Sequence, residues 1–331
     1  MENSILEVKN LKVDFIMDGE RVNAVHEVSF KLGKGRTLGI VGESGCGKSV
    51  SATSIMRLLP KINTIVDDCT SIKLDDEELT TLSDKEFQKV RGNRISMIFQ
   101  EPMTSLNPVY TIGKQLIEMV QSHQKISKKD AFETCVEMLE KVGIPEARKR
   151  MKEYPHQLSG GMRQRVMIAM ALVCNPEVLI ADEPTTALDV TIQAQILELM
   201  NKLKEDTKTS IILITHDMGV VAEVTDEVMV MYAGEVVEHD DVKEIFHNPM
   251  HPYTIGLLDS IPKLNQNTER LLTIDGTVPT LKNMPKVGCR FADRCHYCQD
   301  LCRTESPALK KVGTREVRCH FAGNLKAKED K

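Results

Sequence analysis

The chain has 331 residues, of which 41% are apolar and 27% charged, and 43 Lys and Arg against 48 Asp and Glu leave a formal net charge of −5. This balance excludes a disordered or low-complexity chain, and the mild acidity gives no whole-chain electrostatic reason to bind nucleic acid. The longest apolar run, residues 166–174, is about half of what a membrane-spanning helix needs, and the N-terminal residues lack the apolar core of a signal peptide. We therefore expect a cytoplasmic protein that meets a membrane only through a partner.

Short apolar strands alternate with helical segments along most of the chain. The expected strands are residues 5–8, 11–15, 25–32, 37–41, 95–99, 178–181, 210–215 and 227–232. The expected helices of this core are residues 48–59, 190–204 and 217–224. Such alternation is typical of an α/β core with a largely parallel sheet. A helical stretch at about 104–174 interrupts it as an inserted subdomain, and from residue 248 the Pro density rises and the regular pattern fades.

A glycine-rich segment, GESGCGKS at residues 42–49, lies between the strand at 37–41 and the helix that follows, and it matches G-x-x-x-x-G-K-[ST]. Glycines allow successive backbone N–H groups to point at phosphate oxygens, and the helix N-terminus adds positive potential. We expect Lys48 to reach the β- and γ-phosphates and the Ser49 hydroxyl to ligate Mg²⁺. The expected nucleotide-binding residues of this segment are Gly42, Ser44, Gly45, Cys46, Gly47, Lys48, Ser49 and Val50. An ordinary glycine turn before a helix is the alternative.

An apolar strand at residues 178–181 runs into Asp182 and Glu183. A carboxylate at the carboxyl end of a strand is suited to holding the water shell of Mg²⁺, and a second one beside it can activate an attacking water. His216, after the next strand, is a candidate sensor of the γ-phosphate. Taken alone, each of these is also compatible with a turn or an exposed side chain. Together with the glycine-rich loop they indicate an NTPase.

The segment LSGGMRQR, residues 158–165, identifies the kind of NTPase. It resembles the LSGGQ signature of ATP-binding-cassette (ABC) proteins, with Met162 in place of the Gln. The resemblance implies that Ser159, Gly160 and Gly161 close on the nucleotide held by a second subunit in a head-to-tail dimer. A helix-preceding Ser-Gly-Gly turn is the alternative.

Further elements follow in the order that the ABC family has. Gln100 matches the glutamine that contacts Mg²⁺ and the attacking water, and residues 186–189, ending in Asp189, resemble the D-loop. Phe15 is the candidate for the aromatic that stacks on adenine, with the neighbourhood of Val22 as the alternative and a core aromatic as another. The resemblance also implies that Glu183 is the catalytic base and that His216 is the switch histidine.

The resemblance implies the fold and its division. We expect a P-loop NTPase core of the ABC ATPase type, with a RecA-like parallel sheet and an antiparallel β subdomain. A helical subdomain at about 104–174 carries the signature. The cassette would span residues 1–245, and an irregular, Cys-rich extension would span residues 246–331.

Two segments point to a subgroup. QEPMTSLNP at residues 100–108 and NPMHPYT at 248–254 resemble the ATPases of dipeptide and oligopeptide importers, and residues 158–172 resemble the D-type subunit. This implies ATP hydrolysis at the cytoplasmic face of the membrane, two transmembrane permease subunits, an F-type ATPase or a second copy as partner, and an extracytoplasmic solute-binding protein. Importers of nickel or glutathione belong to the same group. A soluble ABC ATPase acting on DNA or ribosomes, and an iron–sulfur redox sensor, are alternatives of another class.

The cysteines are unevenly placed, since five of the nine lie in the last 43 residues. Because we expect a reducing compartment, this cluster indicates metal or redox chemistry rather than disulfides. The spacing of Cys289, Cys295, Cys302 and Cys319 resembles a motif that holds a [4Fe–4S] cluster in these importer ATPases. Tetrahedral Zn²⁺ or unligated thiols are the alternatives. Cys298 is an extra thiol that can substitute for a neighbour.

Overall fold

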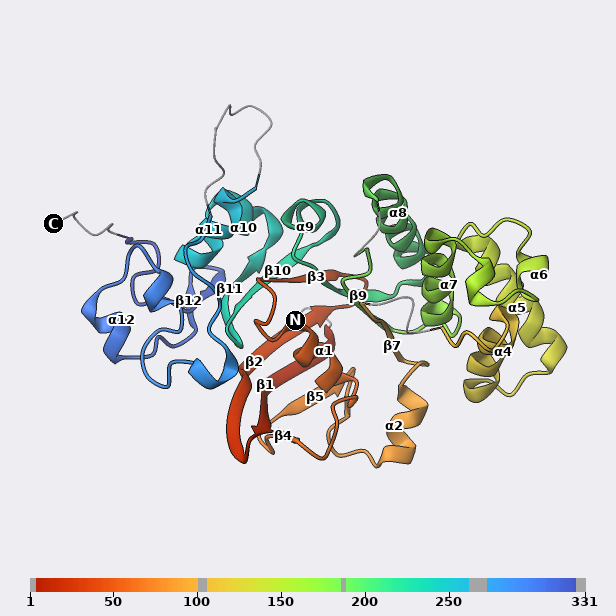
Figure 1. Cartoon of the computed structure of the whole chain (residues 1–331), viewed down its shortest axis with the longest axis horizontal. Helices are drawn as coiled ribbons and strands as arrows, with labels where there is room; N and C mark the ends of the chain where they lie inside the picture. The colour runs from red at the N-terminus through yellow and green to blue at the C-terminus, as the bar shows by residue number, and fades with distance from the viewer. Residues whose placement is uncertain (1–3, 101–105, 186–188, 262–272, 326–331) are drawn as a thin grey trace. The chain divides into compact units, whose positions relative to one another are not determined.

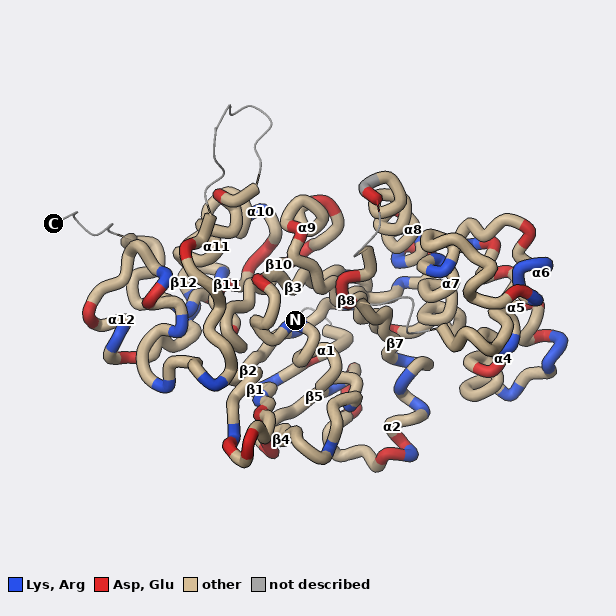
Figure 2. Tube along the Cα trace, in the orientation of Figure 1, with Lys and Arg blue, Asp and Glu red and all other residues tan. Residues whose placement is uncertain are grey.

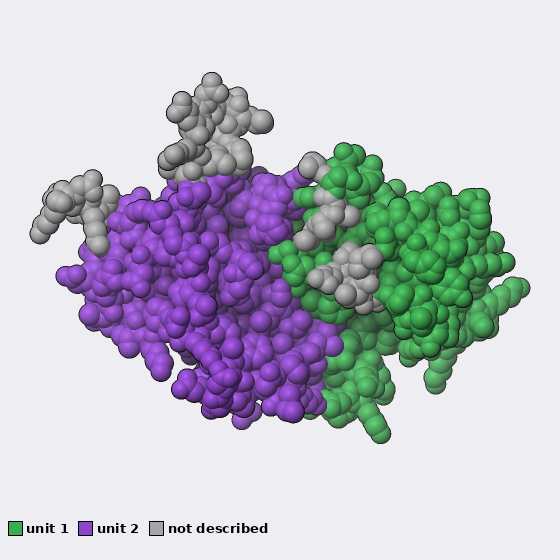
Figure 3. All heavy atoms as spheres, in the orientation of Figure 1, with its two compact units in different colours: residues 1–6, 32–36, 73–213 green, residues 7–31, 37–72, 214–331 purple. Residues whose placement is uncertain are grey.

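The computed structural model describes residues 4–100, 106–185, 189–261 and 273–325. The chain forms two compact units, shown in Figure 3. Unit 1 comprises residues 1–6, 32–36 and 73–213, and unit 2 comprises residues 7–31, 37–72 and 214–331. The division that we expect at residue 245 stays a prediction.

Unit 1 combines several strands with a set of helices (Figure 1). Its strands are β6 (Glu77–Glu78), β7 (Ile95–Ile98), β8 (Val178–Asp182) and all but the last residue of β9 (Ser210–Ile214). Its helices are α2 (Asp84–Val90), α4 (Ile112–His123), α5 (Lys128–Lys141), α6 (Ala147–Arg150), α7 (Gly160–Leu172) and α8 (Val190–Thr207). Strands β9, β8 and β7 are neighbours in that order, and β7 pairs with β8 in parallel from Ile95↔Val178 to Ile98↔Ala181. Every residue of β7, β8 and β9 is buried, as their mostly apolar sequences predict.

The helical region that the sequence predicts between two core strands is present in unit 1. Helices α4, α5 and α7 pack against one another, and α7 also packs on β7. Ser127 caps α5 by accepting a hydrogen bond from the N–H of Asp130, and Thr111 caps α4 in the same way through Lys114. These caps explain why the helices begin where they do. Lys and Arg are interspersed with Asp and Glu along this region (Figure 2).

Unit 2 carries the glycine-rich loop and the C-terminal region. Its strands include β3 (Thr37–Val41), β4 (Thr64–Val66), β10 (Glu227–Tyr232), β11 (Glu235–Asp241), β12 (Lys310–Val312), β13 (Arg315–Val317) and most of β1 (Ser4–Met17) and β2 (Glu20–Gly33). Its helices are α1 (Lys48–Ile55), α9 (Met218–Val224), α10 (Val242–His247), α11 (Pro252–Asp259) and α12 (Asp300–Thr304). Strand β5 (Ser71–Leu74) has its last two residues in unit 1, where Lys73 and Leu74 pair with Glu78 and Glu77 of β6.

Two sets of strands form within unit 2. Strands β12, β13, β11, β10 and β3 are neighbours in that order, with β10 parallel to β3 and antiparallel to β11. Strands β1 and β2 are neighbours, and β4 pairs with β1 in antiparallel fashion. The expected combination of an α/β core, antiparallel strands and a helical region is therefore confirmed. Within the described residues, no helix is both long and apolar enough to cross a membrane.

Three expectations about element limits are wrong. The helix expected at 48–59 ends at Ile55, because Arg57 adopts a left-handed φ of 48° and the N–H of Leu58 bonds back to the carbonyl of Thr53 at 2.8 Å. The strands expected at 5–8 and 11–15 are the single strand β1, interrupted only by a φ of 50° at Asn10. The tail is also more regular than its composition predicts, since β13 extends the sheet through the pair Glu238↔Val317.

Candidate functional site

The glycine-rich loop connects β3 to α1 in unit 2, as the sequence predicts. Gly42 has a φ of 149°, and a Cβ added there would lie 2.2 Å from the carbonyl oxygen of Met231 and 2.8 Å from the sulfur of Cys46. Gly47 has a φ of 99° and provides the N-cap of α1. Only glycine satisfies both requirements, so the loop can present its N–H groups to a phosphate.

Lys48 is almost completely buried beneath the loop. Its Nζ donates hydrogen bonds to the carbonyl oxygens of Gly42, at 2.7 Å, and of Glu43, at 3.1 Å. An ammonium held by two carbonyls of a glycine-rich loop is suited to binding a polyanion. Cys46 is fully buried, and burial raises the pKa of its thiol, which fits a space-filling residue rather than a nucleophile. Ser44, Gly45 and Ser49 are exposed and Val50 is half-buried.

The carboxylates lie in unit 1, at the carboxyl ends of its parallel strands. Asp182 is the last residue of β8 and is buried, whereas Glu183 beyond it is half-buried. Glu183 has a φ of 46°, a left-handed conformation that a residue other than glycine adopts at an energetic cost. Its carboxylate accepts a hydrogen bond from the side-chain amide of Gln100, at 2.9 Å. The structure thus joins the side chains of Gln100 and Glu183, and Asp182 directly precedes Glu183 in the chain.

The signature segment begins α7 in unit 1. Ser159 caps this helix by accepting a hydrogen bond from the N–H of Met162 at 3.3 Å, while Gly160 is exposed, with open space where a side chain would be. The buried side chain of Gln164 donates to the carbonyl oxygen of Pro184, which ties the signature helix to the turn after Glu183. No sequence pattern predicts this role of Gln164, because a glutamine within a helix has no distinguishing neighbours.

The remaining expected residues are placed as follows. Asp189 caps α8 by accepting from the N–H of Ile192 at 2.9 Å, and Gly161 is half-buried beside Ile192. His216 is exposed after β9 in unit 2, and Phe15 is half-buried on β1 opposite Thr64. Residues 186–188 of the expected D-loop lie outside the described residues.

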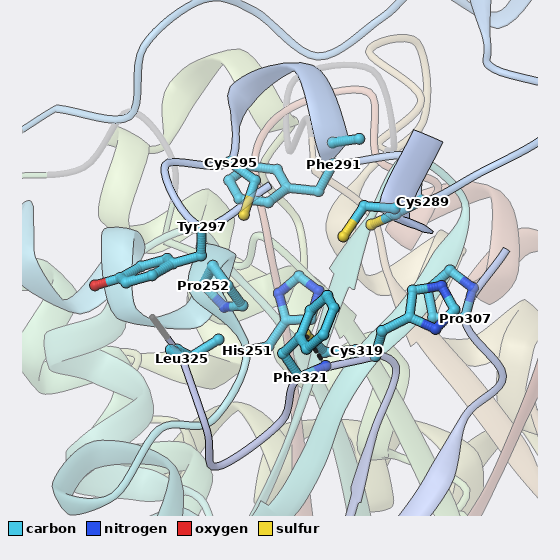
Figure 4. Close-up of a pocket in the computed structure, with 13 residues that line it drawn as sticks. His251, Pro252, Cys289, Phe291, Cys295, Tyr297, Pro307, Cys319, Phe321 and Leu325 are labelled. Atoms are coloured by element: carbon cyan, nitrogen blue, oxygen red, sulfur yellow. Dashed lines mark hydrogen bonds between the residues drawn. The ribbon is translucent and has the colours of Figure 1, made fainter. Parts of the chain in front are cut away.

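Four of the five late cysteines line one pocket of unit 2, together with His251 and Phe291 (Figure 4). The four are Cys289, Cys295, Cys302 and Cys319. All nine cysteines are thiols, and Cys298 is instead buried beside Ala292 and Cys302. Burial, reinforced by the neighbouring cysteines, raises the pKa of Cys289 and of Cys295 to about 12. Such thiols stay neutral at physiological pH unless a cation stabilises the thiolates.

The pocket only partly fits the metal sites that the sequence suggests. Within the described ranges, no three His, Cys, Asp or Glu side chains form a group that could hold a metal ion. A tetrahedral Zn²⁺ needs its sulfur ligands in direct contact with one centre, at about 2.3 Å. The Zn²⁺ alternative is therefore not supported, and the iron–sulfur expectation is left with one argument, the four thiols lining a single pocket.

Two residues of the C-terminal region contact the glycine-rich loop, and the sequence did not assign them this role. The guanidinium of Arg294 binds the carboxylate of Glu43, and the Tyr253 hydroxyl accepts a hydrogen bond from the N–H of Glu43. Tyr253 lies within the NPMHPYT segment at residues 248–254, whose pattern indicates only the subgroup. No local pattern predicts contacts across more than 200 residues of chain.

Comparisons with known proteins agree with this arrangement. A model of the ABC transporter family matches residues 25–186, and a model of the C-terminal region of oligopeptide/dipeptide transporters matches residues 237–302. The chain is 54% identical to the oligopeptide transport ATP-binding protein AppD of Bacillus subtilis, over 96% of both chains. It is 51% identical to the oligopeptide transport ATP-binding protein OppD of Escherichia coli, over 96% of this chain and 93% of the relative. The dipeptide transport ATP-binding protein DppD of Bacillus subtilis is 57% identical over 88% of this chain and 86% of its own length.

Solved structures show the same fold. The ATP-binding cassette MJ0796, in a post-hydrolysis dimer bound to ADP and phosphate, superposes with a TM-score of 0.63 at 29% identity, over 72% of this chain and 98% of that one. CbiO1 of Clostridium perfringens, part of an ABC transporter complex, gives a TM-score of 0.63 at 27% identity, over 75% and 92% of the two chains. The chain therefore belongs to the ABC transporter family, as an ATPase of the oligopeptide/dipeptide transport group.

Proposed function

We propose that this chain is the D-type ATPase subunit that powers the uptake of dipeptides or oligopeptides through separate permease subunits. It would lie at the cytoplasmic face of the membrane and pair head to tail with an F-type ATPase or with a second copy. The observation that supports this most is the 54% identity to an oligopeptide transport ATP-binding protein over 96% of both chains. A solute-binding protein outside the membrane would deliver the peptide.

The chemistry that we propose begins with the bound nucleotide. Lys48 and the loop N–H groups would hold the phosphates, and the adenine would stack on Phe15. Bound Mg²⁺, reached by Ser49, Gln100 and Asp182, would neutralise charge on the phosphate oxygens. Glu183 would take a proton from water as the water oxygen bonds to the γ-phosphorus and the bond to the ADP oxygen breaks. His216 would contact the γ-phosphate.

The second nucleotide would lie against the signature of this chain. Ser159, Gly160 and Gly161 offer a hydroxyl and N–H groups at the start of α7, which is a suitable anion site. Asp189, at the start of α8, would lie at the same dimer interface. ATP binding would close the dimer, and hydrolysis would reopen it and move the permeases.

The experiment that tests this function is affinity purification of the tagged full chain from gently solubilised membranes. We expect two permease subunits and a second ATPase to copurify, and uptake of labelled peptide to require this chain. A Lys48→Ala chain is the matched control, since it should still assemble with the permeases but fail to support uptake. Copurification of nucleic acid or ribosomes without permeases would overturn the proposal, and uptake restricted to nickel or glutathione would change the cargo.

We also propose that the pocket lined by Cys289, Cys295, Cys302 and Cys319 holds a [4Fe–4S] cluster. Four thiols of one pocket are the donor set that such a cluster needs, and a cluster would offset the cost of ionising buried thiols. Iron and acid-labile sulfide should copurify anaerobically with the wild type and with Cys69→Ser, an exposed cysteine, but not with Cys319→Ser. Cys298→Ser tests whether the extra thiol replaces a ligand. Stoichiometric zinc, or no metal at all, would contradict the cluster.

A further inference from the structure

Glu43, the second residue of the glycine-rich loop, is held by an arginine from the C-terminal region of unit 2. Arg294 Nη1 donates to Glu43 Oε2 at 2.6 Å, and Nη2 donates to Oε1 at 3.0 Å. The arginine side chain is only 6% exposed, while the glutamate side chain is 32% exposed. A bidentate pair of this kind combines charge with a defined orientation, and the buried guanidinium requires a partner.

The side chain of Arg294 also makes contacts outside the glycine-rich loop. Its Nε donates to the carbonyl oxygen of Asp275 at 2.7 Å, and Nη2 also donates to that of Gly276 at 3.3 Å. The guanidinium carbon lies 5.7 Å from the ring centroid of Tyr232. Since these contacts fix the plane of the guanidinium, the position of Arg294 determines the position of the Glu43 carboxylate, and not the reverse.

A second contact holds the backbone of the same loop residue. The hydroxyl of Tyr253 accepts a hydrogen bond from the N–H of Glu43 at 2.8 Å, and its ring is fully buried against Tyr232 and Phe291, with centroids 4.7 Å and 5.4 Å away. The carbonyl oxygen of Glu43 in turn accepts from Lys48 Nζ. A shift of Glu43 would therefore move a carbonyl oxygen that holds the ammonium of Lys48, the side chain that we propose binds the phosphates.

We propose that Arg294 and Tyr253 are positioning residues of the phosphate loop, which make ATP affinity depend on the C-terminal region. The inference rests on the proposed ATP-binding function and extends it to residues that touch no nucleotide. It also links the loop to the cysteine pocket, because Phe291 lines that pocket and Arg294 immediately precedes Cys295. Loss of either contact should weaken binding of ATP while leaving the hydrolytic residues of unit 1 intact.

The test is a titration of the purified full chain with a fluorescent ATP analogue, combined with steady-state ATPase kinetics. Arg294→Gln and Glu43→Gln should each raise the Kd about fivefold to tenfold, and the double variant should be no weaker than the worse single one, because both remove the same contact. Tyr253→Phe keeps the ring and removes only the acceptor, so it should raise the Kd about threefold. Each should raise KM with kcat nearly unchanged.

Arg303→Gln is the matched control, since Arg303 lies in the same region and pairs with Asp293 but contacts no residue of the loop. Its Kd should equal that of the wild type. If Arg294→Gln does not fold, Glu43→Gln and Tyr253→Phe carry the test, and wild-type Kd values for both would overturn the inference. A wild-type chain that binds no ATP would overturn the proposed function itself, whereas equal ATP binding by wild type and variants overturns the positioning role alone.

Discussion

The side-chain amide of Gln100 donates a hydrogen bond to the carboxylate of Glu183, with 2.9 Å between the two atoms. The two residues follow the parallel neighbours β7 and β8, whose register pairs Ile98 with Ala181. Each is two residues beyond its member of this pair, so the register brings the amide and the carboxylate to the same edge. The contact orients the carboxylate that we propose as the catalytic base.

Glu183→Gln should bind ATP with nearly wild-type affinity and lose hydrolysis by about 10²- to 10⁴-fold, because an amide cannot take the proton from water. Steady-state ATPase assays and nucleotide titration of the purified chain check this. Glu198→Gln, an exposed glutamate on α8, should hydrolyse ATP like the wild type. Hydrolysis by Glu183→Gln within a factor of two of the wild type would exclude the role as base.

Gly42→Ala should lower the free energy of unfolding by about 2–3 kcal/mol and weaken ATP binding, since its Cβ would lie 2.2 Å from the Met231 carbonyl oxygen. Denaturant titration measures the first effect. Gly35→Ala is the matched control: its φ of 69° is also unfavourable for alanine, but no atom lies within 4 Å of the added Cβ. It should cost only about 1 kcal/mol. Equal losses for the two variants would show that the close approach at Gly42 is unimportant.

His239 should make unit 2 less stable as the pH rises above neutrality. Burial lowers its pKa, but the carboxylates of Glu227 and Glu316, 3.4 Å and 3.5 Å from its ring nitrogens, outweigh burial and raise the pKa to about 9. Because the pKa is higher in the folded chain, the stabilisation is complete below about pH 6.5 and is lost as the pH rises through 9. Urea titrations should show a loss of up to about 3 kcal/mol over this interval. His239→Gln should flatten this part of the profile, and an unchanged profile would contradict the assignment.

Arg315→Met should lower the free energy of unfolding by about 3–5 kcal/mol, because it leaves buried carboxylates without their cation. The Arg315 side chain is 6% exposed and lies 3.3 Å from Asp240, 2.6 Å from Glu244 and 3.7 Å from Glu238, which is completely buried. Arg303→Met removes an exposed pair of similar chemistry and should change stability by less than about 1 kcal/mol. Thermal and denaturant unfolding compare the two, and equal effects would rule out the buried network as the cause.

The local chemistry of the nucleotide site follows from the sequence alone. The glycine spacing around Lys48, the carboxylates after an apolar run and the Ser-Gly-Gly segment each depend on residues that are neighbours in the chain. Buried parallel strands such as β8 are also evident, because all of their residues are apolar up to the final Asp182. The family could be recognised because these local signals recur in one order.

Only the tertiary structure decided which distant residues meet. The bidentate contact of Arg294 with Glu43 joins residues about 250 positions apart in the chain. The sequence around an arginine does not indicate which distant carboxylate it will pair with. The early end of α1 likewise coincides with a left-handed residue, Arg57, whose residue type does not favour that conformation. The sequence therefore determined the chemistry and the family, while packing determined how the C-terminal region holds the phosphate loop, because burial is a property of the whole chain.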